Sequence, residues 1–275
     1  MGLVHHPNLV TDGLVGCWDA GNRRSYPGAG TTWTDLVSGA NGTLTNTGGD
    51  GPNFNSEKLG CIEFDGTSDY VDFGSYSPTV VTIDFWILIE DGQGPLLYQG
   101  DDAYVEAWSD WFMWRSDHGL RLVPQGTGSV VYIPASVYYD LDGNGQLETW
   151  INIVMVRDYD GSNSIAYVNT VSIGTNTRGT TNAKVFRMFK AGSYYSEGKV
   201  GTMRLYDRAL TYAEIKQNYE ATKTRFAPRI AKRGMNLNFD AGDPASYAGG
   251  TTTWKDTANG LTTVFNNMDA SNFNS

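Results

Sequence analysis

The chain has 275 residues, of which 18% are charged and 13% aromatic, and its formal net charge at pH 7 is −10. An acidic chain without clusters of Lys and Arg argues against a nucleic-acid partner, because neutralising phosphates requires such clusters. The sequence also lacks an apolar run of about 18 residues, which argues against insertion into a membrane. Abundant Gly, Ser, Thr and Asn predict short strands joined by many turns, in one large domain with a remainder.

Residues 1–12 precede the first predicted strand and lack the charged start and apolar stretch of a secretory signal. We interpret them as an N-terminal attachment segment. Cys17 and Cys61 are too few for a disulfide scaffold. We expect both to be buried, reduced thiols, with a single bridge between them as the alternative.

Runs of alternating apolar residues, separated by polar turns, repeat over residues 13–226 and predict an all-β domain. The clearest strand spans residues 81–90, where one face is entirely apolar and must pack inward. Residues 148–158 and 200–207 carry apolar groups on both faces, which is typical of central strands.

The stretch at residues 104–114, YVEAWSDWFMW, is rich in aromatic side chains. Trp108, Trp111 and Trp114 cannot all share one face of a strand, because successive side chains alternate. Such rings could lie on a surface where sugars stack, which makes the three tryptophans candidate glycan contacts. Packing in the core is the alternative.

Residues 140–148, DLDGNGQLE, place oxygen-bearing side chains at every second position, as a calcium loop does. Position twelve of that loop is Ile151 instead of a bidentate Glu, and the same string is typical of an exposed turn. A calcium site and an ordinary turn therefore both stay open. The candidate ligands are Asp140, Asp142, Asn144, Gln146 and Glu148, with Gly145 at the turn.

Residues 163–174, NSIAYVNTVSIG, predict a hairpin. Apolar residues alternate on both sides of Asn169 and Thr170, so the turn lies near these two residues. The two strands are therefore expected to pair in antiparallel fashion.

One helix is predicted over residues 210–226. Thr211 and Glu214 have the spacing of a capping box, and Leu210 and Ile215 have that of a hydrophobic staple. Apolar residues continue at helical spacing, so one side of this amphipathic helix is expected to pack on the sandwich in a structural role.

No pattern in the sequence predicts an enzyme. Glycoside hydrolysis needs two carboxylates about 5–9 Å apart. Glu106 and Asp110 would lie about 13 Å apart along a strand. His5, His6 and His118 have no Ser or Cys at a spacing that suggests a nucleophile and its base. We expect a non-enzymatic protein with no cofactor other than the calcium considered above.

The opening of the chain recurs near its end. GLVGCWDAGNRRSYPGAGTTWTDLVSGANG starts at Gly13 and GMNLNFDAGDPASYAGGTTTWKDTANG at Gly234, an offset of 221 residues. After a two-residue slip, NFNS at Asn53 matches NFNS at Asn272. The offset also relates Asp19 to Asp240, Ser25 to Ser246, Tyr26 to Tyr247, Trp33 to Trp254 and Asp35 to Asp256.

Residues 227–275 are therefore interpreted as a linker and a partial second repeat. The second copy ends at Ser275, where the first goes on to CIEFDGTSDYVDF, so half a sandwich would leave an apolar face uncovered. Two interpretations stay open: the chain continues beyond this point with a second domain, or the half-repeat pairs with a neighbouring chain by strand addition.

Strings over nearly all of residues 13–226 resemble, in their order, concanavalin A-like, laminin-G-type domains. The resemblance implies a jelly-roll β-sandwich of two antiparallel sheets, with the strand near residues 14–19 beside the late strand near residues 203–207. It departs at Thr170, where the family usually has Gly, so the turn type stays open. The strings are GLVGCWDAGNRRSYPGAGTTWTDL, FDGTSDYVDFG, VTIDFWI, ETWINIVMV, IAYVNTVSIG and VGTMRLYDRALTYAEIKQNYEATKTRF.

The opening and closing strings most resemble versions of this domain in virion proteins of tailed phages, particularly marine and cyanobacterial ones. This implies a virion structural protein, as a capsid decoration, knob or fibre, assembled in the host cytoplasm. Its partners would be other virion proteins or copies of itself. Domains of this kind often carry calcium near a rim used for sugar binding, so the alternative is an adhesin that recognises host surface glycans. The two roles are compatible.

Overall fold

The computed structural model describes residues 8–46, 51–74, 81–91, 95–99, 110–115, 119–123, 131–132, 150–156, 163–177, 186–226, 253–255 and 262–264. The chain forms two compact units, Met1–Ala227 and Pro228–Ser275, and each is described by itself.

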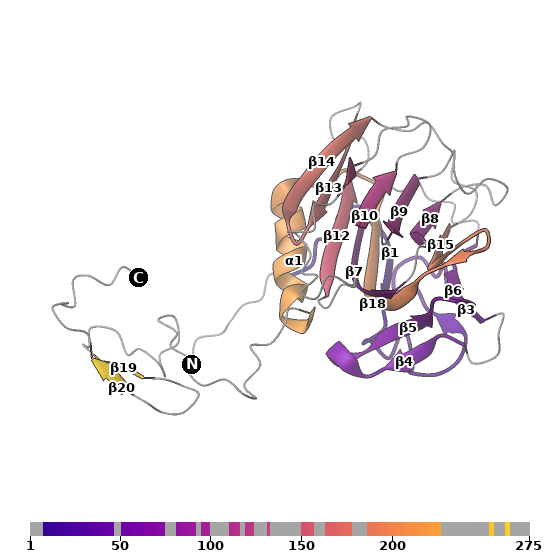
Figure 1. Cartoon of the computed structure of the whole chain (residues 1–275), viewed down its shortest axis with the longest axis horizontal. Helices are drawn as coiled ribbons and strands as arrows, with labels where there is room; N and C mark the ends of the chain where they lie inside the picture. Colours follow the sequence, from indigo (N-terminus) through magenta and orange to yellow (C-terminus); the bar gives the residue numbers. More distant parts are fainter. Residues whose placement is uncertain are drawn as a thin grey trace. The chain divides into compact units, whose positions relative to one another are not determined.

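The first unit is the predicted β-sandwich of two antiparallel sheets, and its described residues include one α-helix (Figure 1). In the first sheet, β1 (Leu14–Asp19) pairs with β18, which confirms the neighbour that the resemblance implied. The other strands of this sheet are, in spatial order, β14 (Val171–Thr177), β13 (Asn163–Val168), β12 (Ile151–Val156), β7 (Thr82–Asp91), β18 (Glu197–Tyr206), β5 (Cys61–Asp65) and β4 (Asn53–Asn55).

The second sheet lies across the core from the first. Beside the second sheet is a short hairpin of β16 (Lys190–Ala191) and β17 (Tyr194–Tyr195). In the first sheet, a 3₁₀ turn at Glu57–Leu59 connects β4 to β5. The strands of the second sheet are, in order, β11 (Val131–Tyr132), β10 (Gly119–Val123), β9 (Asp110–Arg115), β8 (Pro95–Gln99), β15 (Phe186–Met188), β6 (Asp69–Asp72), β3 (Gly42–Asn46) and β2 (Thr32–Trp33).

A continuous apolar core fills the space between the sheets. The first sheet contributes Ile83, Phe85 and Ile87, alternate residues of the strand predicted at 81–90. The second sheet contributes residues such as Val71. Strand β12 lies between β7 and β13 and buries both of its faces, as predicted for a central strand.

Helix α1 (Tyr212–Phe226) lies against the outer face of the first sheet. Its start is the predicted capping box: the Glu214 N–H donates to Thr211 Oγ1 (3.3 Å), and Glu214 Oε2 accepts from the Thr211 N–H (2.8 Å). Leu210 and Ile215 belong to one buried cluster, as the predicted staple requires. No helix among the described residues is long and apolar enough to cross a membrane.

A buried ion pair lies on this helix-covered face. Arg204 on β18 donates from Nε and Nη2 to the two carboxylate oxygens of Asp84 on β7, at 3.1 and 3.0 Å. The same carboxylate accepts from Asn152 Nδ2 (2.8 Å) and from Asn218 Nδ2 of α1 (3.2 Å). A charged group that is removed from water needs hydrogen-bonding partners of this kind. The network therefore connects α1 to three strands of the first sheet, β7, β12 and β18.

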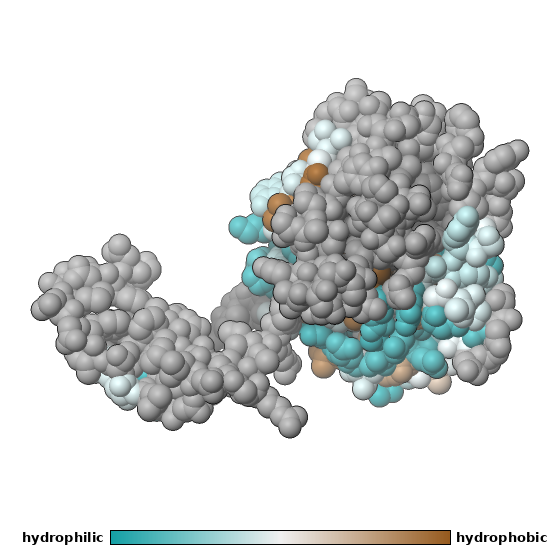
Figure 2. Space-filling view, in the orientation of Figure 1, coloured by the Kyte–Doolittle hydropathy of each residue, from teal (hydrophilic) through white to brown (hydrophobic). Residues whose placement is uncertain are grey.

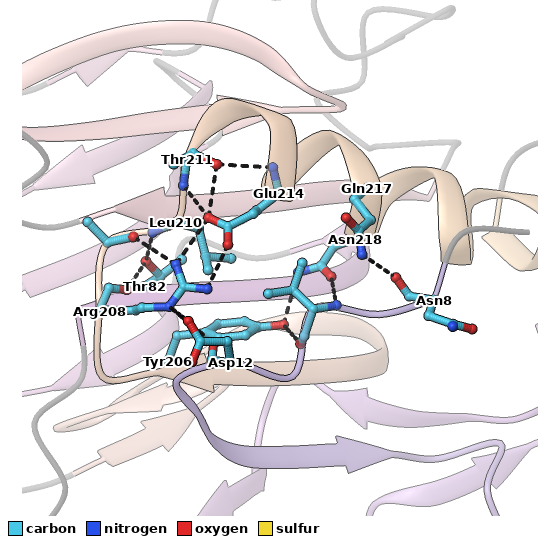
Figure 3. Close-up of polar contacts among 12 residues, drawn as sticks. Asn8, Asp12, Thr82, Tyr206, Arg208, Leu210, Thr211, Glu214, Gln217 and Asn218 are labelled. Carbon is cyan, nitrogen blue, oxygen red and sulfur yellow. Dashed lines mark hydrogen bonds and ion pairs between the residues drawn. The ribbon is translucent and has the colours of Figure 1, made fainter.

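Residues 8–12 pack against the helix and belong to the first unit (Figure 3). The Val10 N–H donates to Asn218 Oδ1 (2.9 Å), and the Tyr206 hydroxyl donates to the Val10 carbonyl (3.1 Å). Asn218 Nδ2 also donates to the Tyr206 hydroxyl (2.9 Å). This end of the predicted attachment segment therefore contributes to the sandwich, and its role in attachment stays a prediction.

The hairpin of β13 and β14 turns at Asn169 and Thr170, as predicted. Both residues have positive φ, 48° and 70°, which is typical of a type I′ turn. Asn169 suits this conformation, and its Oδ1 accepts from the Asn152 N–H (2.9 Å). Thr170 adopts it at a steric cost, because its side chain is β-branched.

Both cysteines are free thiols. Cys61 is fully buried, as expected, whereas Cys17 is half-buried. Burial raises the pKa of Cys61 to about 12 and the pKa of Cys17 to about 11. Both groups are therefore protonated and unreactive at neutral pH.

The second unit contains one described hairpin. Trp254 pairs with Thr263 there as Trp33 pairs with Gly42 in the first unit, with each partner displaced by the repeat offset of 221 residues. This agrees with the internal match in the sequence, and a partial second sandwich stays a prediction. The hairpin consists of β19 (Thr253–Lys255) and β20 (Thr262–Val264).

Candidate functional site

Most of the residues predicted as site candidates lie outside the described residues. Trp111 and Trp114 fall on β9, of which the backbone is described. Among the described residues, no group of three or more His, Cys, Asp or Glu could hold a metal ion. The calcium site therefore stays a prediction. The candidates outside the described residues are Asp140, Asp142, Asn144, Gln146, Glu148, Trp108, Glu106, His5, His6 and His118.

A groove of about 690 Å³ lies beside the edge strands β2 and β4 of the two sheets. Sites for small ligands typically enclose about 300–1,000 Å³, so its size suits a short oligomer. At this end of the unit, around β3 to β6, the described surface in Figure 2 is largely hydrophilic with small hydrophobic areas. The lining residues are Tyr26, Gly28, Ala29, Gly30, Thr31, Thr43, Leu44, Thr45, Asn46, Gly51, Pro52, Asn53 and Phe54.

Two aromatic rings form the apolar part of the groove. Phe54 on β4 is 37% exposed and Tyr26 is 3% exposed, and their ring centroids lie 6.0 Å apart. The Tyr26 hydroxyl donates to the Gly30 carbonyl (2.9 Å), which fixes the ring within its own turn. Gly28 has a φ of +98°, and a Cβ there would lie 3.6 Å from the Phe54 ring. Glycine suits the positive φ at this position and leaves the facing edge of the Phe54 ring uncovered.

Hydroxyl and amide groups form the polar part of the groove. Thr43 and Thr45 are alternate residues of β3, so both face away from the core, which Leu44 enters. Asn46 is oriented by Asp69, whose Oδ1 accepts from Asn46 Nδ2 at 2.8 Å. None of the described lining residues is charged. An apolar ring bordered by neutral hydroxyl and amide groups is suited to a hydroxylated, uncharged ligand.

The turn that carries Tyr26 is held by residues that recur in the second copy. Ser25 Oγ donates to the Thr34 carbonyl (2.6 Å) and accepts from the Asp19 N–H (3.1 Å). The Asp35 carboxylate accepts from the Cys17 N–H (2.7 Å). Asp19, Ser25 and Asp35 are all repeated in the second copy. Much of the internal match is therefore explained by the framework of the groove.

Sequence patterns did not identify Tyr26 or Phe54 as site residues. The internal repeat did contain a signal for these residues, because both recur in the second copy, as Tyr247 and Phe273. Gly28 recurs there as Gly249. Repetition does not separate framework residues from ligand contacts, so the geometry of the groove is needed to distinguish them.

The second sheet continues from the groove. The register places one row of residues across β3, β6, β15, β8 and β9, and this row starts at the groove wall. A predicted glycan contact, Trp111, therefore shares a row with a groove residue, Thr43. The row consists of Thr43, Asp72, Arg187, Tyr98 and Trp111.

This architecture defines a lectin-like jelly-roll sandwich. Residues 65–216, more than half of the chain, match the family model of the concanavalin A-like lectin/glucanases superfamily. The chain belongs to this superfamily. No curated protein sequence matches it.

Solved structures share the fold at low sequence identity. The sialidase of Trypanosoma rangeli in complex with sialic acid is 15% identical with a TM-score of 0.58, over 80% of this chain and 35% of the sialidase. Domain 4 of AbnA, a GH43 extracellular arabinanase from Geobacillus stearothermophilus, was solved in complex with arabinotriose. It is 15% identical with a TM-score of 0.55, over 76% of this chain and 98% of that domain. The binding domain of Paraclostridial Mosquitocidal Protein 1 is 15% identical with a TM-score of 0.51, over 75% of this chain and 52% of that domain. The chain thus spans about a third of the sialidase, and the likeness shows the fold alone.

Proposed function

We propose that the first unit is a carbohydrate-binding module and that its ligand occupies the groove lined by Tyr26 and Phe54. The observation that carries this proposal is an exposed aromatic ring bordered by neutral hydroxyl and amide groups, in a groove large enough for a short saccharide. Sugar rings offer apolar faces that pack on aromatic side chains and hydroxyl groups that hydrogen-bond to Thr and Asn.

The structural relatives support the same class of ligand. The arabinanase domain, solved in complex with arabinotriose, is aligned over 98% of its length, so the likeness involves that entire domain. At 15% identity this supports a saccharide ligand for the present chain without indicating which sugar.

The proposed module is non-enzymatic. Hydrolysis of a glycosidic bond requires two carboxylates that flank the bond. The described lining of the groove includes neither Asp nor Glu, so these residues are suited to hold a sugar and not to cleave it.

The test is binding of the full chain to a broad glycan panel, followed by calorimetry with the best ligand. Phe54→Ala should weaken binding about tenfold, because an exposed ring that packs on a sugar contributes on the order of 1 kcal/mol. The matched control is Leu59→Ala, which removes another exposed apolar side chain, 75% exposed, outside the groove lining. Unchanged affinity in Phe54→Ala would assign the sugar to another surface, and a panel without any ligand would overturn the proposal.

The virion role stays a prediction, and it is compatible with glycan binding, since a module on a phage particle would contact host surface sugars. Immunogold labelling of purified particles with an antibody to residues 13–226 tests it. Label on the capsid or tail would support the virion role, whereas unlabelled particles would favour a cellular adhesin. Repeating the glycan measurements with a chelator tests the calcium site at residues 140–148.

A further inference from the structure

A lysine ammonium group lies between two tyrosine rings on the outer face of the second sheet. Lys190 Nζ is 4.2 Å from the centroid of the Tyr70 ring and 5.2 Å from that of Tyr195. The two ring centroids are 6.4 Å apart at an interplanar angle of 59°. Aromatic faces attract a cation through their quadrupole and hold it in place, but they do not neutralise its charge.

No carboxylate among the described residues compensates the charge of Lys190. The neighbouring Arg187 donates from Nε to Asp72 Oδ2 at 2.9 Å, which engages the nearby acid. Among the described residues, no carboxylate forms an ion pair with Lys190, whereas Lys199 and Lys223 both have acidic partners.

The backbone departs from regular geometry to place Lys190 there. Met188 and Phe189 are adjacent yet both fully buried, although successive strand residues normally face opposite sides. Phe189 achieves this with a φ of +66°, a conformation that is rare and costly for a bulky side chain. Its ring stacks on Phe64 with centroids 4.1 Å apart. The alternation of inward and outward side chains is thereby shifted by one residue, so that Lys190 faces outward. Bulges often redirect a side chain in this way next to a binding site.

The Lys190 cluster lies beside the groove. Tyr70 on β6 pairs directly with Thr45 on β3, and Thr45 lines the groove. Residues opposite each other on adjacent strands are about 5 Å apart. A saccharide of two or three units with one sugar in the groove can therefore place another at Lys190.

We propose that Lys190, held by Tyr70 and Tyr195, is an anion subsite for the carboxylate or sulfate group of an acidic saccharide. The inference rests on the proposed glycan-binding function. The ammonium group has three N–H donors, and the tyrosine rings leave them available to the oxygens of an anionic ligand. The groove would bind a neutral part of the ligand, and Lys190 would select for the charge next to it.

The experiment uses the full chain and matched pairs of oligosaccharides. Each uronic-acid oligosaccharide is compared with its methyl ester, and each sulfated oligosaccharide with its unsulfated parent, which distinguishes the two sources of charge. The wild type should bind the acidic member of at least one pair about tenfold more tightly, since the contact is charge-assisted. The difference should shrink at higher salt.

Lys190→Gln should abolish this difference while binding of the neutral member persists, and Lys190→Arg, which keeps the charge, should restore much of it. The matched control is Lys223→Gln on α1, whose lysine also lies over a tyrosine ring, at 5.9 Å from Tyr219, but is paired with Glu220. It removes the same charge and should leave the preference intact. Thermal unfolding checks that each variant folds.

The outcomes separate the two proposals. Equal binding of both members in every pair, or a preference that survives in Lys190→Gln, would overturn the anion subsite and leave glycan binding standing. Failure of all saccharides to bind would overturn both. Phe54→Ala should weaken both members of a pair by the same factor, because it acts in the groove.

Discussion

The outer faces of the two sheets carry the same kind of ion pair in opposite surroundings. On the first sheet, which α1 covers, Asp84 and Arg204 have side chains that are 1% and 2% exposed. On the second sheet, Asp72 and Arg187 are 26% and 16% exposed. We refer to these as the covered face and the open face, since no α-helix among the described residues lies on the second.

The two faces differ in how their polar groups are used. On the covered face, Asp84 collects donors from two strands and a helix, so its polar groups are committed to one another. On the open face, Arg187 engages the acid while Lys190 is left to face outward over Tyr70. The first arrangement contributes to folding, and the second leaves charge and aromatic surface partly exposed, where we propose that a ligand binds.

The largest expected effect comes from breaking the covered pair. Asp84→Ala should lower the free energy of unfolding by about 4 kcal/mol, because it leaves the Arg204 guanidinium buried without its counter-charge. The matched change on the open face, Asp72→Ala, should cost at most about 1 kcal/mol, since that pair is partly solvated. Urea-induced unfolding of both variants measures the contrast.

Equal losses in the two variants would contradict the distinction between the faces. Should Asp84→Ala fail to fold, Tyr206→Phe provides a milder test of the same network. It removes only the hydroxyl that accepts from Asn218 and donates to the Val10 carbonyl, with an expected cost of about 1–3 kcal/mol.

Elements with local signals could be predicted from the sequence. The strand that contains Phe85 follows from its alternation, and the helix start follows from Thr211 and Glu214, which are three residues apart. The Asp84–Arg204 pair could not be predicted, because its partners are 120 residues apart and each occurs in a strand where a polar residue is ordinary. Only the sheet register brings them together.

The residues that line the candidate site were not predicted from the sequence. Trp108, Trp111 and Trp114 were candidate glycan contacts, with packing in the core as the alternative. The groove combines Tyr26 and Phe54, which come from segments that the sequence does not join. The placement of Lys190 depends on the left-handed backbone at Phe189, and Phe carries no signal for that conformation, which favours Gly, Asn and Asp.

A smaller effect is expected at alkaline pH, again from the covered face. Burial raises the pKa of the Cys61 thiol from 9.0 to about 12, so the unfolded chain loses this proton first as the pH rises. The stability that comes from the raised pKa of Cys61 is fully present below pH 9 and is lost between pH 9 and pH 12. The free energy of unfolding should therefore fall by about 1 kcal/mol per pH unit in this window.

Urea unfolding at a series of pH values measures that slope. Cys61→Ala should flatten it, while Cys17→Ala should act over a narrower window, because the pKa of Cys17 is raised only to about 11. A slope that Cys61→Ala leaves unchanged would assign the alkaline loss of stability to other groups.

The smallest effect should come from the turn between β13 and β14. Thr170→Gly should raise the free energy of unfolding by about 1 kcal/mol, since glycine adopts a φ of 70° without the clash of a β-branched side chain. Asn169→Gly at the adjacent position should instead lower it, because Asn169 Oδ1 accepts from the Asn152 N–H, and Asn152 in turn donates to Asp84. Urea unfolding of the two variants should give opposite signs. The same sign in both would show that the turn is not type I′ or that Asn169 does not support the covered face.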